Sequence, residues 1–458
     1  MTSYPGAAAP DPALRSPAAA DPGLYRTLWR WHFYAGLFVL PFILALSVTG
    51  SIYLFKPQID RWEERAFHNL PTADAVSADQ QLAAVMAAKP GARFDAFRLP
   101  ERPGDAAMVQ VELPNGATRQ VFVAPGGTVL GTFDPATRLS DTVSRIHGSL
   151  LLGRWGDWLV ELAASWTIIL LLSGLYLWWP RPFRAAGTLW PRLRLRGRPL
   201  LKDLHRVTGF WIAGLVLLML VSGLPWAGVW GTALRTVRTE LGALQGTQDW
   251  KVGAADPHAG HHGAMQPGPA MHPPMTAGLP LSAFVARAQG EHMAFPVLVL
   301  PPHAPQRFGP PTGDVWTVKS EAQNRPLDRQ VTYNPATGAQ VGRKDFADQP
   351  VVDRVVNTGV AWHEGQLFGW ANQLLGLLTA IALVATSVLG VLTWLRRRPA
   401  GSLGAPPPGS GARRRGLVVA VVIAGLLLPL FGLSVLVLAL LDLIGRRFFG
   451  HDRPAPVN

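Results

Sequence analysis

The chain has 458 residues, 48% of them hydrophobic, with a formal net charge of +13 and no cysteine. So many apolar residues, gathered in separate runs, exclude a single ordinary soluble domain. Without cysteine the chain forms no disulfide, thiolate metal site, iron–sulfur cluster or covalently attached c-type haem, so any redox centre needs other ligands.

Five stretches are apolar and long enough to cross a bilayer as helices, for which about 20 residues each are needed. They lie near 33–55, 158–179, 208–230, 374–395 and 417–444. The first follows an Ala/Pro-rich tail and ends without a small-residue cleavage site, so we expect a retained anchor. The sequence therefore predicts a multi-pass protein in a lipid bilayer.

The positive charge is concentrated in the two short loops 181–203 and 397–415, where arginines outnumber acidic residues. By the positive-inside rule both loops are cytoplasmic. The N-terminus is then also inside, and the long segments 57–146 and 231–362 lie on the other side. Because this topology explains the basic loops, the charge does not indicate a nucleic-acid-binding protein. The fifth span would place Arg446, Arg447 and Arg453 on the disfavoured side.

Two spacing patterns recur in the two halves of the chain and indicate an internal duplication. The pattern H-x3-G-x13-G occurs as His32, Gly36, Gly50 and again as His205, Gly209, Gly223. The pattern H-x5-G-x20-G-x3-W occurs as His147, Gly153, Gly174, Trp178 and again as His363, Gly369, Gly390, Trp394.

The two outer segments are predicted to be related α+β modules. The first offers a helix over 77–91, a strand over 107–113 and a hairpin over 120–133 around Gly126-Gly127. The second offers the same order, with a helix over 279–290, a strand over 315–320 and a hairpin over 330–342. Each half of the chain therefore reads as helix, module, helix.

Because consecutive spans alternate in direction, His32 and His205 are expected at the cytoplasmic face, and His147 and His363 at the outer face. Two histidines from facing helices are the usual axial ligands of b-type haem, and they give a six-coordinate iron suited to electron transfer. The pattern therefore predicts two haem b groups, one held by each pair. The bland alternative for any one of these histidines is an interfacial polar residue.

The glycines of the repeats admit two explanations. Gly36 and Gly209, one turn after their histidines, would clear helix surface for a porphyrin. Close helix packing alone would account for the remaining four, namely Gly50, Gly174, Gly223 and Gly390.

The depth of His147 leaves two arrangements open. It precedes the apolar run that begins at Trp158, and a straight helix would carry it about 16 Å beyond the hydrocarbon. Either the outer haem lies in the external layer, or the helix bends near Gly153 and Gly156.

The stretches "RIHGSLLLGRWGDWLVELAASWTIILLLSGLYLWWPR" at 145–181 and "DLHRVTGFW" at 203–211, with the H-x3-G spans, resemble the PepSY-associated transmembrane helix family. The likeness covers about 25–398 without the segment around 250–310, and the outer modules resemble PepSY domains. Members with this layout are bacterial inner-membrane proteins, often linked to iron uptake, and include di-haem ferric-siderophore reductases. The resemblance implies that His32, His147, His205 and His363 are haem ligands.

The stretch 258–275 gathers imidazoles and thioethers in a Pro/Gly-rich outer loop, which suits copper, zinc or a passing ferric ion, although an incidental loop is the other interpretation. Its candidate ligands are His258, His261, His262, His272, Met265, Met271 and Met275.

Glu161, inside span two, is either a proton donor or hydrogen-bonding group near the haem or an interfacial carboxylate paired with an arginine. Seven tryptophans read mostly as an aromatic belt: Trp155, Trp158, Trp178, Trp179, Trp362, Trp370 and Trp394.

The predicted fold is a mainly α integral membrane protein, a duplicated transmembrane helix–PepSY-like α+β module–transmembrane helix unit with one extra C-terminal helix, five in all. The expected segments are a tail 1–24, spans 25–56, 147–180, 204–230, 363–396 and 416–445, outer modules 57–146 and 231–362, basic loops 181–203 and 397–415, and a tail 446–458.

The predicted function is an oxidoreductase of the bacterial inner membrane that carries electrons from the cytoplasmic side to a periplasmic ferric siderophore. No Rossmann fingerprint, P-loop or flavin-type domain is found, so the electron donor is a membrane quinol or a cytoplasmic reductase. Two alternatives remain open: a non-enzymatic sensor or binding protein that uses the PepSY modules, and a di-haem reductase of copper or another periplasmic acceptor.

Overall fold

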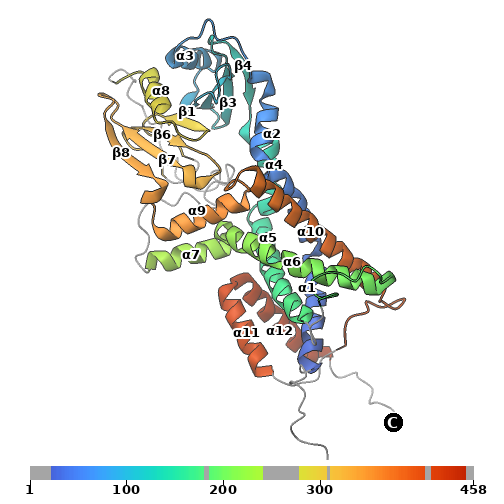
Figure 1. Ribbon diagram of the computed structural model, residues 1–458. Helices are drawn as coiled ribbons and strands as arrows, with labels where there is room; N and C mark the ends of the chain where they lie inside the picture. Colours follow the sequence, from blue (N-terminus) through green and yellow to red (C-terminus); the bar gives the residue numbers. More distant parts are fainter. Residues whose placement is uncertain (1–21, 180–184, 241–277, 307–309, 408–413, 450–458) are drawn as a thin grey trace, which may run out of the picture. The chain divides into compact units, whose positions relative to one another are not determined.

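The structure, a computed structural model, describes residues 22–179, 185–240, 278–306, 310–407 and 414–449 (Figure 1). It divides into two compact units. Unit 1 comprises Met1–Leu40, Trp166–Trp211 and Thr386–Asn458, and unit 2 comprises Pro41–Ser165 and Ile212–Ala385.

Five of the described helices are long and apolar enough to cross a membrane. They are α1 (Pro22–Tyr53), α5 (Gly153–Trp178), α6 (Gly197–Gly223), α10 (Trp370–Leu395) and α12 (Pro429–Phe449). The first four agree with the predicted spans, although all four helices begin earlier because a helix continues past its apolar stretch. The third span also ends earlier than predicted, at Gly223 rather than 230, because the chain turns at Leu224–Trp226 before α7 begins at Gly228. The chain is therefore a multi-pass membrane protein.

The fifth predicted span was wrong as one continuous helix. Residues 417–444 form part of two helices, α11 (Arg414–Leu427) and α12, and only α12 is long enough to cross a membrane. Pro429 lacks the N–H that a continuous helix needs, and it is well suited to the first helical position. A Cβ on Gly425 would lie 3.1 Å from the Cα of Gly432, so the two helices fold closely against each other. Hydrophobicity alone did not reveal this break.

Within unit 1, α12 packs against α5. The Trp166 indole donates to Ser434 Oγ at 3.1 Å, and its ring meets that of Phe431 edge-on, with centroids 4.9 Å apart. The C-terminal hairpin is therefore attached to α5 by specific side-chain contacts.

Unit 2 contains one eight-stranded antiparallel sheet, in the order β4-β3-β2-β1-β5-β6-β7-β8. Its strands are β1 (Arg93–Arg98), β2 (Ala107–Glu112), β3 (Thr118–Val123), β4 (Val129–Phe133), β5 (Val297–Leu300), β6 (Trp316–Ser320), β7 (Arg329–Tyr333) and β8 (Gln340–Asp345). The predicted hairpins and single strands are all present. The sequence did not predict β1 and β5, nor that their pairing joins the two modules into one sheet.

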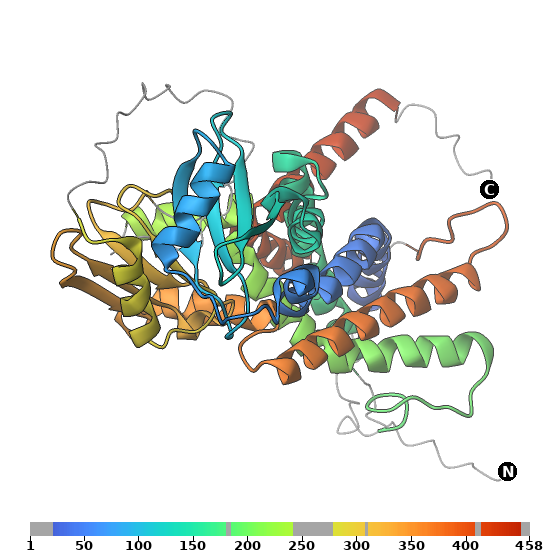
Figure 2. The same cartoon turned by 90° about the horizontal axis from the view of Figure 1, so that it is seen from above.

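The core of the sheet lies on the face that carries two short helices, α3 (Ala78–Ala88) and α8 (Leu281–Gly290) (Figure 2). A row of paired residues crosses six strands under these helices: Val121, Val109, Phe97, Val299, Val318 and Val331. All six are buried, so the row continues without interruption across the β1–β5 junction. The order of one helix followed by four strands therefore occurs twice along the chain, and both sets share one continuous core.

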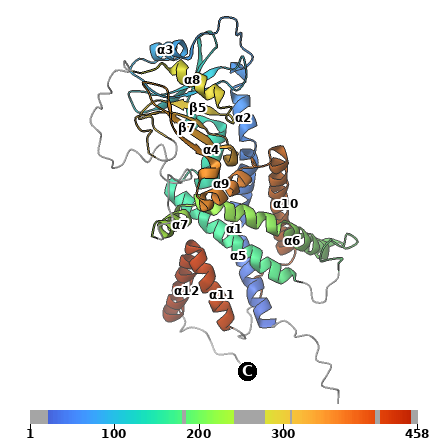
Figure 3. The ribbon, with the colours of Figure 1, turned by 60° about the vertical axis from the view of Figure 1, so that its left-hand side comes forward.

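Several shorter helices complete unit 2 (Figure 3). They are α2 (Lys56–Glu63), α4 (Leu139–Ser149), α7 (Gly228–Glu240), α9 (Val351–His363) and the 3-10 turns η1 (Arg65–Phe67), η2 (Pro135–Thr137), η3 (Leu224–Trp226), η5 (Arg325–Leu327) and η6 (Phe346–Asp348).

The chain turns sharply between α4 and α5, so the bend expected near Gly153 and Gly156 is the arrangement found. Leu150, Leu151 and Gly153 all have positive φ. A Cβ on Gly156 would lie 1.7 Å from the carbonyl oxygen of Ser149, so only glycine permits this return of the backbone. A corresponding break separates α9 from α10, where Gly365 and Gly369 have positive φ. The segments 147–180 and 363–396 are therefore not single helices.

Two candidate histidine sites

In unit 1, His32 on α1 and His205 on α6 lie side by side. Their ring centroids are 6.4 Å apart and the ring planes are inclined by 82°. Both rings are half-buried.

In unit 2, His147 on α4 and His363 on α9 form a second pair of similar geometry. Their centroids are 6.2 Å apart and the planes are inclined by 71°. The structure thus brings together the same two pairs that the alternation of spans predicted.

The spacing of each pair fits two imidazoles that share one metal ion. A ligating nitrogen lies about 2.0 Å from a metal and about 1.1 Å from the centre of its own ring, so two facing rings are separated by about 6.3 Å. The measured separations of 6.4 and 6.2 Å agree with this distance.

The Nδ1 atom of each ring is held by a neighbouring helix. His205 Nδ1 donates to the Thr386 carbonyl at 2.9 Å, and His363 Nδ1 donates to the Met219 carbonyl at 2.8 Å. A carbonyl oxygen can only accept, so Nδ1 carries the proton and Nε2 keeps the lone pair. Nε2 is therefore the nitrogen available to a metal.

Hydroxyl groups hold His32 and His147 in the same sense. His32 Nδ1 lies 3.0 Å from Ser173 Oγ, and His147 Nδ1 lies 3.0 Å from Thr49 Oγ1. Each hydroxyl donates its own proton to a backbone carbonyl one turn earlier, Ser173 to Leu170 at 3.0 Å and Thr49 to Ala45 at 2.8 Å. The hydroxyl oxygen is thus left to accept from Nδ1–H, so the four rings share one tautomer.

Four glycines, which we call the seat glycines, lie against these rings: Gly50 at His147, Gly174 at His32, Gly223 at His363 and Gly390 at His205. A Cβ on any of them would come within 3.1 to 3.3 Å of the ring's Cε1 atom. A residue larger than glycine would therefore push the imidazole a few tenths of an ångström away from the helix. The group that a Cβ at each of these glycines would meet is a histidine of the other pattern. Close helix packing stays the other interpretation of these glycines.

Gly36 and Gly209, predicted to clear room for a porphyrin, are less crowded. A Cβ there would make ordinary contacts of 3.7 Å, with Leu170 and Thr386 respectively. Their part in binding a porphyrin stays a prediction.

Burial keeps the histidines of unit 2 neutral. It lowers the pKa of His147 to about 4, with His363 lowering it further, and it also lowers the pKa of His363. Neutral imidazole is the form that ligates iron. The donor set, its tautomer and its spacing therefore fit a haem b iron in each pair.

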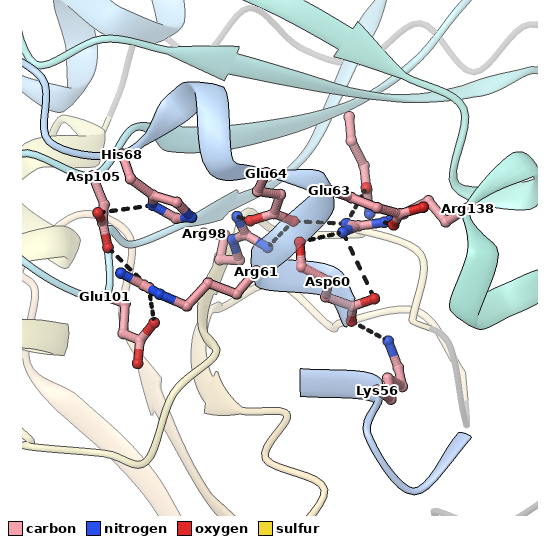
Figure 4. Close-up of polar contacts among 11 residues, drawn as sticks. Lys56, Asp60, Arg61, Glu63, Glu64, His68, Arg98, Glu101, Asp105 and Arg138 are labelled. Atoms are coloured by element: carbon pink, nitrogen blue, oxygen red, sulfur yellow. Dashed lines mark hydrogen bonds and ion pairs between the residues drawn. The ribbon is translucent and has the colours of Figure 1, made fainter. Parts of the chain in front are cut away.

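Arg138, immediately before α4, anchors that helix to α2 (Figure 4). Its guanidinium is buried and bonds Glu64 at 2.7 Å and Glu63 at 3.1 Å, while Asp60 accepts from Ser140 in the first turn of α4 at 2.6 Å. Burial alone would raise the pKa of Glu64, but Arg98 and Arg138 outweigh it and hold that pKa below its usual range. The helix that carries His147 is thus fixed by charge-assisted bonds.

On the second short helix, Asp353 of α9 pairs with Arg238 of α7 at 2.9 Å, and both are buried. The other end of α7 is held by Glu161, which accepts from the backbone N–H groups of Val229 and Trp230 at 2.9 and 3.0 Å. Glu161 is therefore a helix-capping carboxylate. Glu161 was expected either to pair with an arginine or to act near the haem. In the described part of the chain its hydrogen bonds go instead to the backbone of α7.

The remaining predicted site residues divide into two groups. The His/Met-rich loop 258–275 lies outside the described residues. Trp155, Trp179 and Trp370 are exposed, as in an aromatic belt, but Trp178 is buried and stacks on Phe210 at 3.9 Å. Within the described ranges, no group of three or more His, Cys, Asp or Glu side chains is arranged to hold a metal ion.

The hydroxyl residues of the sites were not predicted, although the sequence carries a signal for them. A hydroxyl residue precedes the seat glycine in "TG" at 49–50 and "SG" at 173–174 and 222–223, whereas Leu389 precedes Gly390. Ser222 Oγ lies 3.3 Å from His363 Nδ1, which completes the set.

A search of curated proteins finds no match to this chain. The model of the PepSY-associated TM region matches residues 29–397, a stretch that includes all four histidines and all four seat glycines. On that match, which covers most of its length, the chain belongs to the family of proteins with a PepSY-associated transmembrane region.

Proposed function

We propose that this protein is a di-haem b cytochrome of the bacterial inner membrane that reduces a ferric chelate, such as a ferric siderophore, in the periplasm. In this proposal the N-terminus is cytoplasmic, the sheet of unit 2 is periplasmic, and the two halves of the chain arose by duplication. Electrons enter from the cytoplasmic side or from a membrane quinol.

The observation that carries the proposal is the occurrence of two histidine pairs with one design. In each pair the ring centroids lie 6.4 or 6.2 Å apart, close to the distance expected for two imidazoles that share one metal ion. Each ring has its Nδ1 atom bonded and its Cε1 edge against a seat glycine. A merely interfacial histidine needs neither of these constraints.

When bound, haem iron supplies one-electron transfer, and the protein sets its ligands, access and potential. His32 and His205 would hold one iron, and His147 and His363 the other, each through Nε2. With both histidines of a pair bound, the iron would serve electron transfer rather than direct binding of a substrate.

The electron count constrains the donor. A ferric ion takes one electron to become ferrous, so a quinol oxidised to quinone reduces two ferric chelates and releases two protons. Hard oxygen donors prefer the ferric state, and reduction therefore weakens the hold of the chelate on the metal.

The test uses the purified full-length protein. We expect a reduced-minus-oxidised spectrum of six-coordinate haem b and two haems per chain. The dithionite-reduced protein, freed of excess dithionite, should be reoxidised anaerobically by a ferric siderophore, with ferrous iron trapped in equal amount by a ferrous-specific chelator.

Replacement of both His147 and His363 by alanine is the matched control, since it should leave one haem and slow reoxidation by the bulky chelate. Absence of haem from the wild-type protein would overturn the proposal. Haem that is reoxidised by Cu(II) but not by ferric chelates would preserve the cytochrome and change the acceptor.

A further inference from the structure

The four histidines differ in one hydrogen bond. His32, His147 and His363 each lie within hydrogen-bond distance of a hydroxyl oxygen, from Ser173, Thr49 and Ser222. At the corresponding position beside His205 the sequence has Leu389. The Nδ1 atom of His205 donates to the Thr386 carbonyl.

The hydroxyl residues have a constant place in the helix. Each immediately precedes a seat glycine, and the carbonyl of the residue four positions before that glycine faces the same ring: Leu46 for His147, Leu170 for His32 and Met219 for His363. Thr386 stands four positions before Gly390, so His205 has the same carbonyl bond, but Leu389 occupies the position of the hydroxyl residue. The chain therefore contains its own comparison of the site with and without that group.

The chemical effect of the extra oxygen has a definite sign. An additional acceptor draws the Nδ1 proton away from the ring, so Nε2 becomes a stronger electron donor. A stronger donor stabilises ferric iron relative to ferrous iron and lowers the reduction potential.

We propose that Thr49, Ser173 and Ser222 are positioning residues that lower the reduction potential of the haem iron held by the histidine each contacts. The pair His147/His363 has two such hydroxyls and the pair His32/His205 has one. This inference rests on the proposed function, because it concerns iron that the four histidines would hold.

The experiment measures each site alone. His147→Ala leaves the His32/His205 site, and His32→Ala leaves the His147/His363 site. In the first background, Ser173→Ala should shift the ferric/ferrous equilibrium of the remaining haem toward ferrous iron by on the order of tenfold, which is about 59 mV in a spectroelectrochemical titration. Thr49→Val and Ser222→Ala should do the same in the second background.

Leu389→Ser is the decisive variant, because it adds the missing hydroxyl in the register that Ser173 and Ser222 occupy. It should shift the His32/His205 site in the opposite direction, toward ferric iron, relative to Leu389→Ala. Ser173→Thr keeps the hydroxyl and should therefore keep the wild-type reduction potential, unlike Ser173→Ala. Thr379→Val is the matched control, since the Thr379 hydroxyl is buried and donates to the Leu375 carbonyl on α10 in the same helical manner.

If single-site proteins do not fold, the same variants in the wild-type background are compared by the low-temperature electron paramagnetic resonance g-values of the oxidised haems. Potentials and g-values that do not respond to Ser173→Ala, Thr49→Val, Ser222→Ala or Leu389→Ser would overturn the inference and leave the di-haem proposal standing. A wild-type protein without haem would overturn the proposed function itself.

Discussion

The two histidine sites share one geometry but are built on different supports. In unit 1 both histidines, His32 and His205, belong to the long helices α1 and α6. In unit 2 the histidines His147 and His363 belong to the short helices α4 and α9, which are separated from α5 and α10 by turns. The long helices α1 and α6 contribute there the seat glycines Gly50 and Gly223 and the groups that bond the rings, Thr49, Ser222 and the Met219 carbonyl.

This difference teaches that a duplicated spacing pattern does not imply equal mechanical support. A ligand on a long membrane helix is fixed by the packing of the whole helix. A ligand on a helix of 11 or 13 residues depends on what anchors that helix, because short isolated helices are marginal. The His147/His363 site should therefore be more sensitive than the His32/His205 site to substitutions of residues that do not touch the histidines.

The largest expected effect comes from removal of a ligand. Replacement of any one of the four histidines by alanine should abolish one of the two haems, because each haem would lose one of the two side chains that hold it. Haem content per chain, measured by pyridine haemochrome, should fall by half. His303→Ala is the control, since this histidine is exposed and pairs with Asp314.

The ligand variants also test the pairing. His147→Ala and His363→Ala should remove the same haem, with identical residual spectra, and His32→Ala and His205→Ala should remove the other. Residual spectra that group His32 with His147 would contradict the pairing seen in the structure.

The next effect comes from the seat glycines. Gly223→Ala would place a Cβ 3.1 Å from His363 Cε1, so the ring must shift and the haem of unit 2 should bind roughly tenfold more weakly. Gly214, on the same helix, has open space at its Cβ position. Gly214→Ala should leave haem binding unchanged and favour the helix by up to about 1 kcal/mol. Haem retention is measured by titrating each variant with a haem-binding apo-protein that competes for the haem. Equal retention by Gly223→Ala and Gly214→Ala would show that the seat glycine is dispensable.

The anchor of α4 acts on the site only indirectly, through the stability of the helix, and should discriminate between the sites. Arg138→Met leaves Glu63 and Glu64 without this buried partner, which typically costs about 3–5 kcal/mol. We expect earlier thermal loss of the His147/His363 haem and an unchanged His32/His205 haem. Arg145→Met is the control, because Arg145 is an exposed arginine on the same helix. Equal loss of both haems would mean that the two sites are not supported independently.

The sequence predicted four of the spans and the two histidine pairs well because both are set by local pattern. Apolar length identifies a membrane helix, and alternation of direction pairs His32 with His205 and His147 with His363. The β1–β5 junction was not predictable, since Phe97 and Val299 are far apart in the chain and "RFDAFR" has charged residues at its ends. The break at Pro429 and the hydroxyl residues before the seat glycines had local signals in the sequence. That these hydroxyls and glycines meet the histidine rings depends on three-dimensional contacts, which the sequence pattern does not show.

The smallest effect concerns pH and is confined to the sheet of unit 2. Burial raises the pKa of Asp95 on β1 to about 6, against the opposing effect of Arg93 at 3.0 Å, and Glu112 raises it further. The folded protein therefore binds a proton that the unfolded chain has already released. The contribution of Asp95 to the free energy of unfolding thus falls as pH rises from about 4 to about 6 and then stays level.

Asp95→Asn removes this dependence. The variant should be more stable than wild type at pH 7.5 and nearly equal at pH 4, and the gain should appear in the thermal retention of the His147/His363 haem alone. A gain of the same size at both pH values would mean that the carboxyl group keeps its charge throughout, and a gain shared by the His32/His205 haem would mean that the sheet supports both sites.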